Sequence, residues 1–248
     1  MIIRRSNIAF DRWTDFRHAI EQMIATGEYE RLVRIHNEMR RDADGFGFSR
    51  RRMHGTMSRP LGVRRFLPWH RAYLIVFERA LRAIDNTLSL PYWDWNDDGG
   101  RLVGVRTFLG LSSGRDLGAP AGVPPAPGQQ PWFTSEAEVA SIVGFGGDYF
   151  TMSDFLESDP HNRGHDWVAG DMNSMSSPRD PVFWMHHAQI DRIWSVWQST
   201  NPGERATLSG QEARMDPWGA EFDVDNIDDI SNLGADSYSY EAPPGGGQ

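Results

Sequence analysis

The residues with the clearest chemical potential are the histidines, because the chain has eight of them and no cysteine. A transition metal would therefore have to be bound by imidazole or carboxylate. His161 and His165 stand four residues apart in the segment His-Asn-Arg-Gly-His. On a helix this spacing places both rings on one face, where they can bind the same ion. A single histidine on an apolar helix face is more often a core residue than a ligand. Only the joint placement of several histidines therefore indicates a metal site.

Two further histidines, His36 and His70, lie in the middle of apolar helical stripes. His70, for example, shares its stripe with Phe66, Tyr73 and Phe77. Burying an unpaired imidazole costs a few kcal/mol. Metal coordination or a specific hydrogen bond must offset that cost at both positions.

Adjacent histidines, His186 and His187, follow the dipeptide Asp180-Pro181. His187 falls on the same stripe as Phe183, whereas His186 is rotated by about 100°. We therefore expect His187 to be a ligand and His186 to support or pack against the site.

The donor set limits the choice of metal. Neutral imidazole suits zinc, copper, iron and nickel, and an all-histidine set favours copper or zinc. Three histidines with one open position form a known catalytic zinc arrangement. Two such triplets on facing helices would give a dinuclear site inside a helix bundle.

The elements that must position these side chains are predicted to be mainly helical. The apolar periodicity predicts helices over about 10–26, 29–40, 68–85, 135–143, 151–157 and 181–198. Gly27 separates the first two helices, and Pro68 and Asp180-Pro181 mark the starts of two others. Segments 41–65 and 96–131 are predicted to be long irregular loops. We expect one domain over residues 1–242 and a disordered Pro/Gly-rich tail over 243–248.

Composition excludes several kinds of partner. The net charge of −9 argues against nucleic acid and anionic membranes, which attract basic surfaces. No apolar run approaches the ~20 residues of a membrane span. Met1–Arg5 is not followed by an apolar region typical of a secretory signal, so we expect a cytoplasmic protein or one exported with a helper.

Several long motifs resemble the tyrosinase family. Phe66–Leu74 (Phe-Leu-Pro-Trp-His-Arg-Ala-Tyr-Leu) and Leu90–Trp95 resemble its first copper-binding segment. His161–Trp167 and Asp180–Trp194 resemble the second. The resemblance implies a mainly α fold, in which a central antiparallel four-helix bundle holds a dinuclear copper site, with long irregular loops and few short strands.

The resemblance also implies the ligands: His36, His54 and His70 for the first copper, and His161, His165 and His187 for the second. The interval between His54 and His70 is longer than usual in the family, and Leu61 occupies the place of the second ligand in an ungapped alignment. We interpret Ser58–Arg64 as an insertion and retain His54. The alternative is a site that lacks one ligand.

Further positions are assigned by the same resemblance. Glu157 and Asn162 resemble the pair that orients a water able to take a proton from a monophenol. Met175 and Asp166 lie where the family places residues near the mouth of the site, and Phe183 resembles the aromatic packed over the copper pair; we group the three as a substrate gate. Tyr238-Ser-Tyr240 resembles a motif often tied to an N-terminal arginine, here Arg4 or Arg5.

The implied function is copper-dependent oxidation of a small phenolic substrate by dioxygen. Monophenols would be ortho-hydroxylated and o-diphenols oxidised to o-quinones. A catechol or o-aminophenol oxidase without hydroxylation is an alternative, as is a haemocyanin-like dioxygen-binding protein. A dinuclear zinc hydrolase fits the histidine count but not the motifs. Bacterial relatives also suggest a small copper-delivering helper protein.

Overall fold

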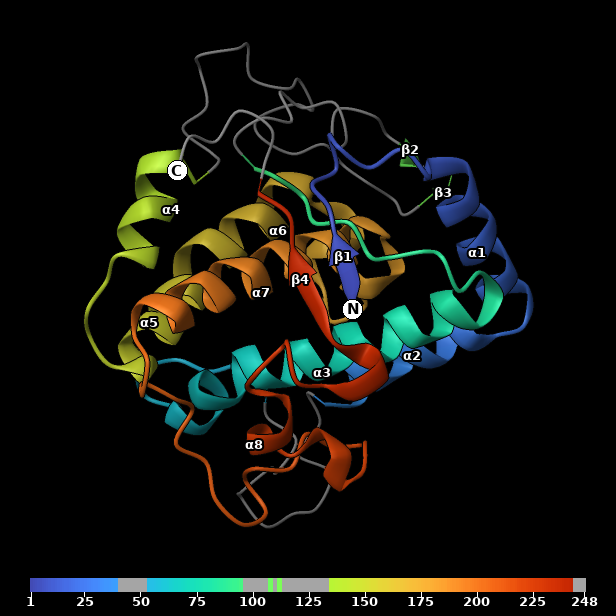
Figure 1. The fold of residues 1–248 in the computed structure, drawn as a ribbon. Helices are drawn as coiled ribbons and strands as arrows, with labels where there is room; N and C mark the ends of the chain where they lie inside the picture. Colours follow the sequence, from blue (N-terminus) through green and yellow to red (C-terminus); the bar gives the residue numbers. More distant parts are fainter. Residues whose placement is uncertain (40–52, 96–106, 109–110, 113–133, 243–248) are drawn as a thin grey trace.

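The computed structural model describes residues 1–39, 53–95, 107–108, 111–112 and 134–242, and this part of the chain is mainly helical, as predicted (Figure 1). Most of the two predicted loops and the predicted tail lie outside the described residues. The elements are β1 (Ile2–Arg4), α1 (Trp13–Ala25), α2 (Glu28–Glu38), α3 (Pro60–Ile84), β2 (Thr107–Phe108), β3 (Leu111–Ser112), α4 (Glu136–Val143), α5 (Tyr149–Leu156), the π-helical turn η1 (Glu157–His161), α6 (Asn162–Val168), the 3-10 turns η2 (Gly170–Asn173) and η3 (Ser177–Arg179), α7 (Val182–Thr200), η4 (Ala220–Phe222), α8 (Val224–Ile227), η5 (Gly234–Asp236) and β4 (Tyr238–Tyr240).

Helices α1 and α2 form where the periodicity predicts them. Gly27 separates the two helices with a φ of 79°, a left-handed conformation that glycine adopts without steric cost. Phe16, Ile20 and Met23 are buried along the inner face of α1. This helix packs against both α2 and α3, so the turn at Gly27 folds α2 back against α1.

The predicted start of the third helix at Pro68 is wrong. Helix α3 begins at Pro60, which occupies its first turn, where a missing backbone N–H costs nothing. Pro68 lies inside the helix and cannot donate to the carbonyl of Arg64. The hydroxyl of Tyr149 donates to that carbonyl at 3.0 Å instead, so the helix continues and residues 60–65 are helical rather than part of a loop.

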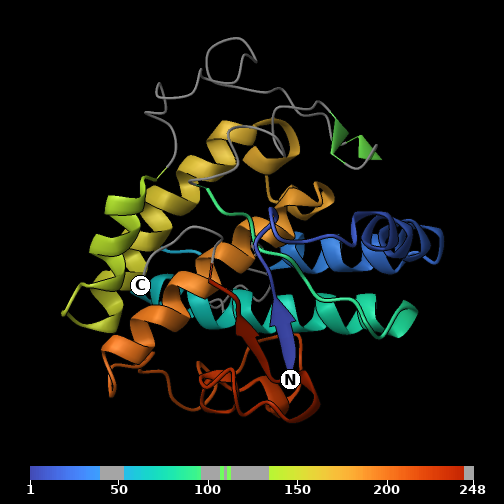
Figure 2. The same cartoon turned by 45° about the horizontal axis from the view of Figure 1, so that its top comes forward.

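Helix α7 agrees with its sequence signals. Pro181 is the N-cap residue of the helix and offers no side-chain cap, but the carboxylate of Asp180 before it accepts the backbone N–H of Val182 at 2.9 Å. Helix α3 packs against α5 and α7. Figure 2 shows α3 and α7 crossing in the middle of the molecule, with α4 and α5 on one side and α1 and α2 on the other.

A short parallel pair of strands joins two distant parts of the chain, with Ile2 opposite Tyr238 and Arg4 opposite Tyr240 in β1 and β4 (Figure 1). Arg4 donates to the Tyr240 hydroxyl at 2.9 Å, and its guanidinium lies 3.6 Å from the centre of the Tyr238 ring. Of the two arginines considered from the sequence, Arg4 therefore contacts the Tyr-Ser-Tyr segment.

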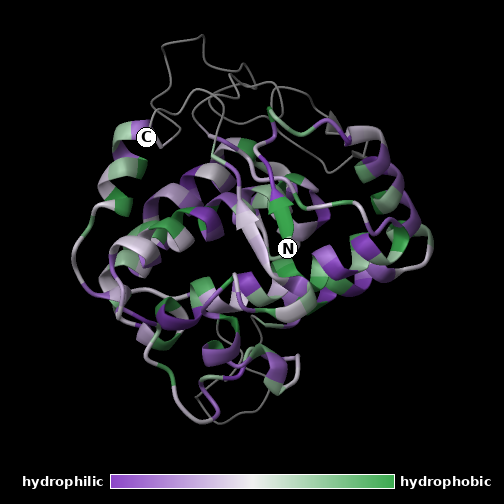
Figure 3. Cartoon of the chain, in the orientation of Figure 1, coloured by the Kyte–Doolittle hydropathy of each residue, from purple (hydrophilic) through white to green (hydrophobic). Residues whose placement is uncertain are grey.

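The core between the helices is rich in aromatic side chains. Phe77 of α3 and Trp184 of α7 stack with ring centres 3.9 Å apart. Hydrophobic and hydrophilic residues share most helices, in keeping with one buried and one exposed face (Figure 3). Among the described residues, no helix has both the length and the apolar character needed to span a membrane.

Candidate metal centre

Two groups of three histidines meet at the centre of the described structure. The first group combines His36 of α2, His54 from the segment before α3, and His70 of α3, and one ring nitrogen from each lies within 4.8 Å of the others. The second group, with the same closeness, consists of His161 at the end of η1, His165 of α6 and His187 of α7. Every histidine predicted as a ligand is therefore in one of the two groups.

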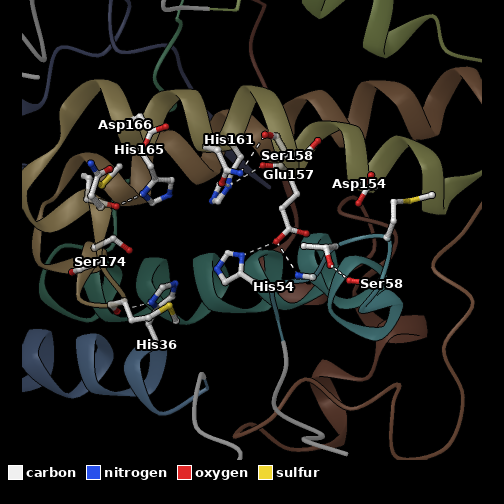
Figure 4. Close-up of a pocket in the computed structure, with 18 residues that line it drawn as sticks. His36, His54, Ser58, Asp154, Glu157, Ser158, His161, His165, Asp166 and Ser174 are labelled. Carbon is white, nitrogen blue, oxygen red and sulfur yellow. Dashed lines mark hydrogen bonds and ion pairs between the residues drawn. The ribbon is translucent and has the colours of Figure 1, made fainter. Parts of the chain in front are cut away.

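The two groups lie directly against each other. The rings of His70 and His187 are stacked, with centres 4.2 Å apart and planes inclined by 11°. His54 and His161 also face each other across the groups, with ring centres 5.5 Å apart. Figure 4 shows the rings of His36, His54, His161 and His165 turned toward one cavity from opposite sides. The arrangement is thus a single centre with two halves.

Backbone carbonyls fix the rings in one tautomer. The Nδ1 atoms of His36, His70 and His165 lie 2.8, 2.8 and 2.6 Å from the carbonyl oxygens of Met175, Phe66 and Met172. A carbonyl oxygen only accepts, so each Nδ1 carries the hydrogen. Each Nε2 consequently presents a lone pair to the centre, which is how histidine ligands are usually oriented.

Three of the inward nitrogens have no partner among the described residues. The Nε2 atoms of His36, His70 and His161 are buried and make no hydrogen bond, while those of His165 and His187 lie 3.4 Å apart. Burying an imidazole nitrogen unpaired is costly. Two metal ions, each bound by three neutral imidazoles, would satisfy these atoms, and this donor set suits copper.

Burial also keeps the rings neutral. Desolvation lowers the pKa of His36, His70, His161 and His187 well below the ordinary value of 6.5, and the nearby histidines lower it further. Burial likewise lowers the pKa of His165 to about 4. Metal ligation requires neutral imidazole, so the ligands are ready to bind near neutral pH.

His186 supports the site from behind, as predicted. Its Nε2 donates to the carbonyl of His161 at 3.0 Å, and its Nδ1 accepts from the indole nitrogen of Trp95 at 3.2 Å. Both ring nitrogens are thereby used within the protein, which leaves His187 as the member of the pair that faces the centre.

A cavity of about 1120 Å³ leads to the histidines. Its wall includes His36 and His54 from one half and His161 and His165 from the other, and also four of the other predicted site residues: Glu157, Asn162, Asp166 and Met175. Phe183, in contrast, is fully buried and does not line the cavity. Its ring lies 4.2 Å from that of His187, so it packs behind the centre and does not gate the cavity in this structure.

The family description "Common central domain of tyrosinase" matches residues 26–120 and 126–200, which is well over half of the chain. The chain belongs to the tyrosinase family. A tyrosinase from Streptomyces glaucescens is 30% identical over 96% of this chain and all of its own length.

Solved structures share the fold. A latent aurone synthase (polyphenol oxidase) superposes with a TM-score of 0.70 at 19% identity, covering 99% of this chain and 58% of its own. A functional unit of octopus hemocyanin gives a TM-score of 0.66 at 21% identity, covering 98% of this chain and 68% of its own. Both the enzyme prediction and the resemblance to tyrosinases agree with these findings.

The position of His54 bears on the unusual ligand interval of this tyrosinase-family chain. The structure places His54 beside His36 and His70, which favours an insertion over a missing ligand. Residues 60–64 of the predicted insertion belong to the first turns of α3.

Sequence reasoning missed several supporting groups. The carbonyls of Phe66, Met172 and Met175 orient ligands, but backbone atoms leave no signal in residue type. It also missed the contact between Glu157 and His54, in which Oε1 of Glu157 lies 2.9 Å from Nδ1 of His54. Since these residues are far apart in the chain, only the folded structure reveals their pairing.

Proposed function

We propose that the protein catalyses copper-dependent oxidation of phenols by dioxygen, hydroxylating monophenols at the ortho carbon and oxidising o-diphenols to o-quinones. The observation that carries this proposal is the convergence of unpartnered imidazole nitrogens from two histidine triads. Family membership supports copper as the metal. When bound, two copper ions would supply the activation of dioxygen and accept electrons from the phenol ring.

The protein's own contribution begins with holding the rings still. Nδ1 hydrogen bonds to carbonyls keep His36, His70 and His165 oriented, so little reorganisation accompanies the reaction. A monophenol also has to lose its hydroxyl proton. Glu157 is buried, and in the described part of the chain its Oε2 atom has no hydrogen-bond partner. We assign this oxygen the role of accepting the proton, directly or through one water.

The cavity wall favours particular substrates. The described lining residues include the acidic side chains Asp154, Glu157 and Asp166 and no lysine or arginine. A cleft lined by one sign of charge concentrates ligands of the opposite sign. Phenols that carry an amine should therefore bind better than phenols that carry only a carboxylate, and Met175 would limit their bulk at the wall.

A second candidate is an oxidase of catechols or o-aminophenols that lacks the hydroxylation step. The side chain of Asn162 favours it, because both of its polar atoms are engaged: Oδ1 lies 3.0 Å from Nδ1 of His161, and Nδ2 donates to the carbonyl of Ser158 at 3.2 Å. Asn162 is thus less available to orient a water together with Glu157.

Parallel assays of the copper-loaded protein test the proposal. Oxygen uptake is expected with tyrosine, a catechol and an o-aminophenol. His187→Ala should abolish all three activities, whereas His18→Ala, at an exposed position on α1, should leave them intact. Activity on the last two substrates alone would exclude hydroxylation. Reversible dioxygen binding without turnover would indicate a carrier. Loading from free copper would show that a copper-delivering helper protein is not obligatory.

A further inference from the structure

His54 differs from the other predicted ligands in the contacts that hold its side chain in place. The remaining five come from helices or from η1, whereas His54 lies in the segment that precedes α3. Its side chain is 31% exposed, although His36 and His70 beside it are almost completely buried. Neither a helical backbone nor close burial therefore fixes His54, and other contacts must hold its ring in place.

The first such contact is the carboxylate of Glu157 (Figure 4). One oxygen, Oε1, lies 2.9 Å from Nδ1 of His54 and accepts the backbone N–H of Gly55 at 3.1 Å. Glu157 itself is only 5% exposed and belongs to η1, the turn that ends at His161. One oxygen of this carboxylate thus holds both the ring of His54 and the backbone beside it, and ties a ligand of the first triad to the turn that carries a ligand of the second.

The second contact is between backbones. A Cβ atom on Gly62, in the first turns of α3, would lie 2.0 Å from the carbonyl oxygen of His54, and one on Gly55 would lie 2.2 Å from the backbone nitrogen of Val63. No side chain fits at either position unless the backbone moves. The segment between Gly55 and Gly62 folds back through a tight turn, in which the backbone N–H of Arg59 donates to the backbone carbonyl of Thr56 at 2.7 Å. The start of α3 therefore packs directly against the backbone of His54.

From these contacts we propose that Glu157 and Gly62 are positioning residues that hold His54 as a ligand of the first copper. Gly62 sets the distance between the His54 backbone and α3. Oε1 of Glu157 accepts the Nδ1 hydrogen, so Nε2 faces His36 and His70 with its lone pair free. The proton-accepting role proposed above uses the other oxygen, Oε2, so the two roles can be separated. The inference uses the proposed copper site but not the proposed oxidation of phenols.

Copper affinity tests the role of Glu157 directly. Competition with a chromophoric chelator gives the affinity of each site in the full chain, and His36→Ala and His187→Ala identify which binding event belongs to which triad. Glu157→Ala should weaken the first site about 10–100-fold, the usual effect of losing a partner of a ligand. Glu157→Gln, whose amide oxygen still accepts both hydrogen bonds, should stay within about threefold.

The second site provides an internal control for folding, because η1 supplies His161 with a backbone carbonyl that neither substitution removes. Wild-type affinity at the first site in Glu157→Ala would overturn the proposal. So would equal losses in the Gln and Ala variants. If wild-type protein binds two ions and oxidises no phenol, the proposed function fails while the measured affinities still decide the role of Glu157.

A backbone test is independent of Glu157. Gly62→Ala favours the helix intrinsically but forces the His54 carbonyl away. We expect at least a tenfold weaker first site, an unchanged second site and unchanged helical content. Gly146→Ala is the matched control, since nothing lies within 4 Å of a Cβ placed there. Unchanged first-site affinity in Gly62→Ala would refute the backbone part of the proposal.

Discussion

At the scale of single residues, the histidines are held by atoms that a sequence does not display. The resemblance to tyrosinases predicted which six histidines meet. It could not predict that carbonyls of Phe66, Met172 and Met175 would fix their tautomers, because any residue type carries a carbonyl. The resemblance assigned Glu157 to orient a water together with Asn162, and it gave no sign of the contact between Glu157 and His54.

The buried histidines make acid sensitivity a property of the metal-free protein. Burial lowers the pKa of His161 well below 6.5 and that of His165 to about 4. At a pH between the pKa of these histidines in the folded protein and 6.5, the unfolded chain binds more protons than the folded protein. The histidines therefore contribute their full stability above pH 6.5, and the free energy of unfolding falls as the pH decreases below 6.5. The loss is ~1.4 kcal/mol per pH unit for each such histidine.

Denaturant unfolding of the metal-free protein at pH 7.5 and 5.0 measures this effect. Asp191, whose pKa is lowered by Arg71 and Arg4 against the effect of burial, loses its contribution only below about 3.8, outside the interval. His18→Ala should show the same decline as wild type because His18 is exposed. Equal stability at the two pH values would show that the rings are not buried in the neutral form.

At the scale of elements, the main error of sequence reasoning concerned α3. Pro68 looks like a helix start, but Pro60 carries the same signal and is the true start. The position of Pro68 inside the helix is tolerated because Tyr149 of α5 donates to the carbonyl of Arg64. That compensation comes from a distant segment, so local rules could not anticipate it.

Helices α6 and α7 approach each other closely at Gly164. A Cβ on Gly164 would lie 2.2 Å from Cε1 of His186. The His186 ring cannot move aside easily, since it is fully buried and both of its nitrogens are hydrogen-bonded. The residues that follow each of these two, His165 and His187, belong to the second triad. The packing of this pair of helices therefore controls the geometry of that triad.

Gly164→Ala should accordingly push the two helices apart. We expect a loss of ~1–3 kcal/mol in the free energy of unfolding, the usual cost of overpacking, together with weaker copper binding by the second triad. Thermal unfolding and metal analysis after gel filtration measure both effects. Gly219→Ala, where a Cβ would meet nothing within 4 Å, should change neither. A fully stable Gly164→Ala that keeps two ions would contradict the packing argument.

At the scale of the whole molecule, a buried charge network joins segments from both ends of the described chain to the central helices. Arg4 of β1 lies 2.9 Å from Glu78 of α3 and 3.5 Å from Asp191 of α7. Asp191 also accepts from Arg71 at 2.6 Å and from the Tyr238 hydroxyl at 2.6 Å. These two helices carry His70 and His187, whose rings stack at the metal centre. The network therefore braces the helix pair on which both halves of the site depend.

Neighbouring arginines allow this bracing to be measured. Arg4 is completely buried, and its removal leaves the buried carboxylate of Glu78 without its ion-pair partner while Asp191 keeps Arg71, so Arg4→Met should cost ~3–5 kcal/mol in the free energy of unfolding. Arg5 pairs with Glu241 while both side chains are nearly half exposed, so Arg5→Ala should cost no more than ~1 kcal/mol. Denaturant unfolding at neutral pH separates the two variants. Similar losses in both would mean that the strand pair, and not the buried charge, holds α3 and α7 together.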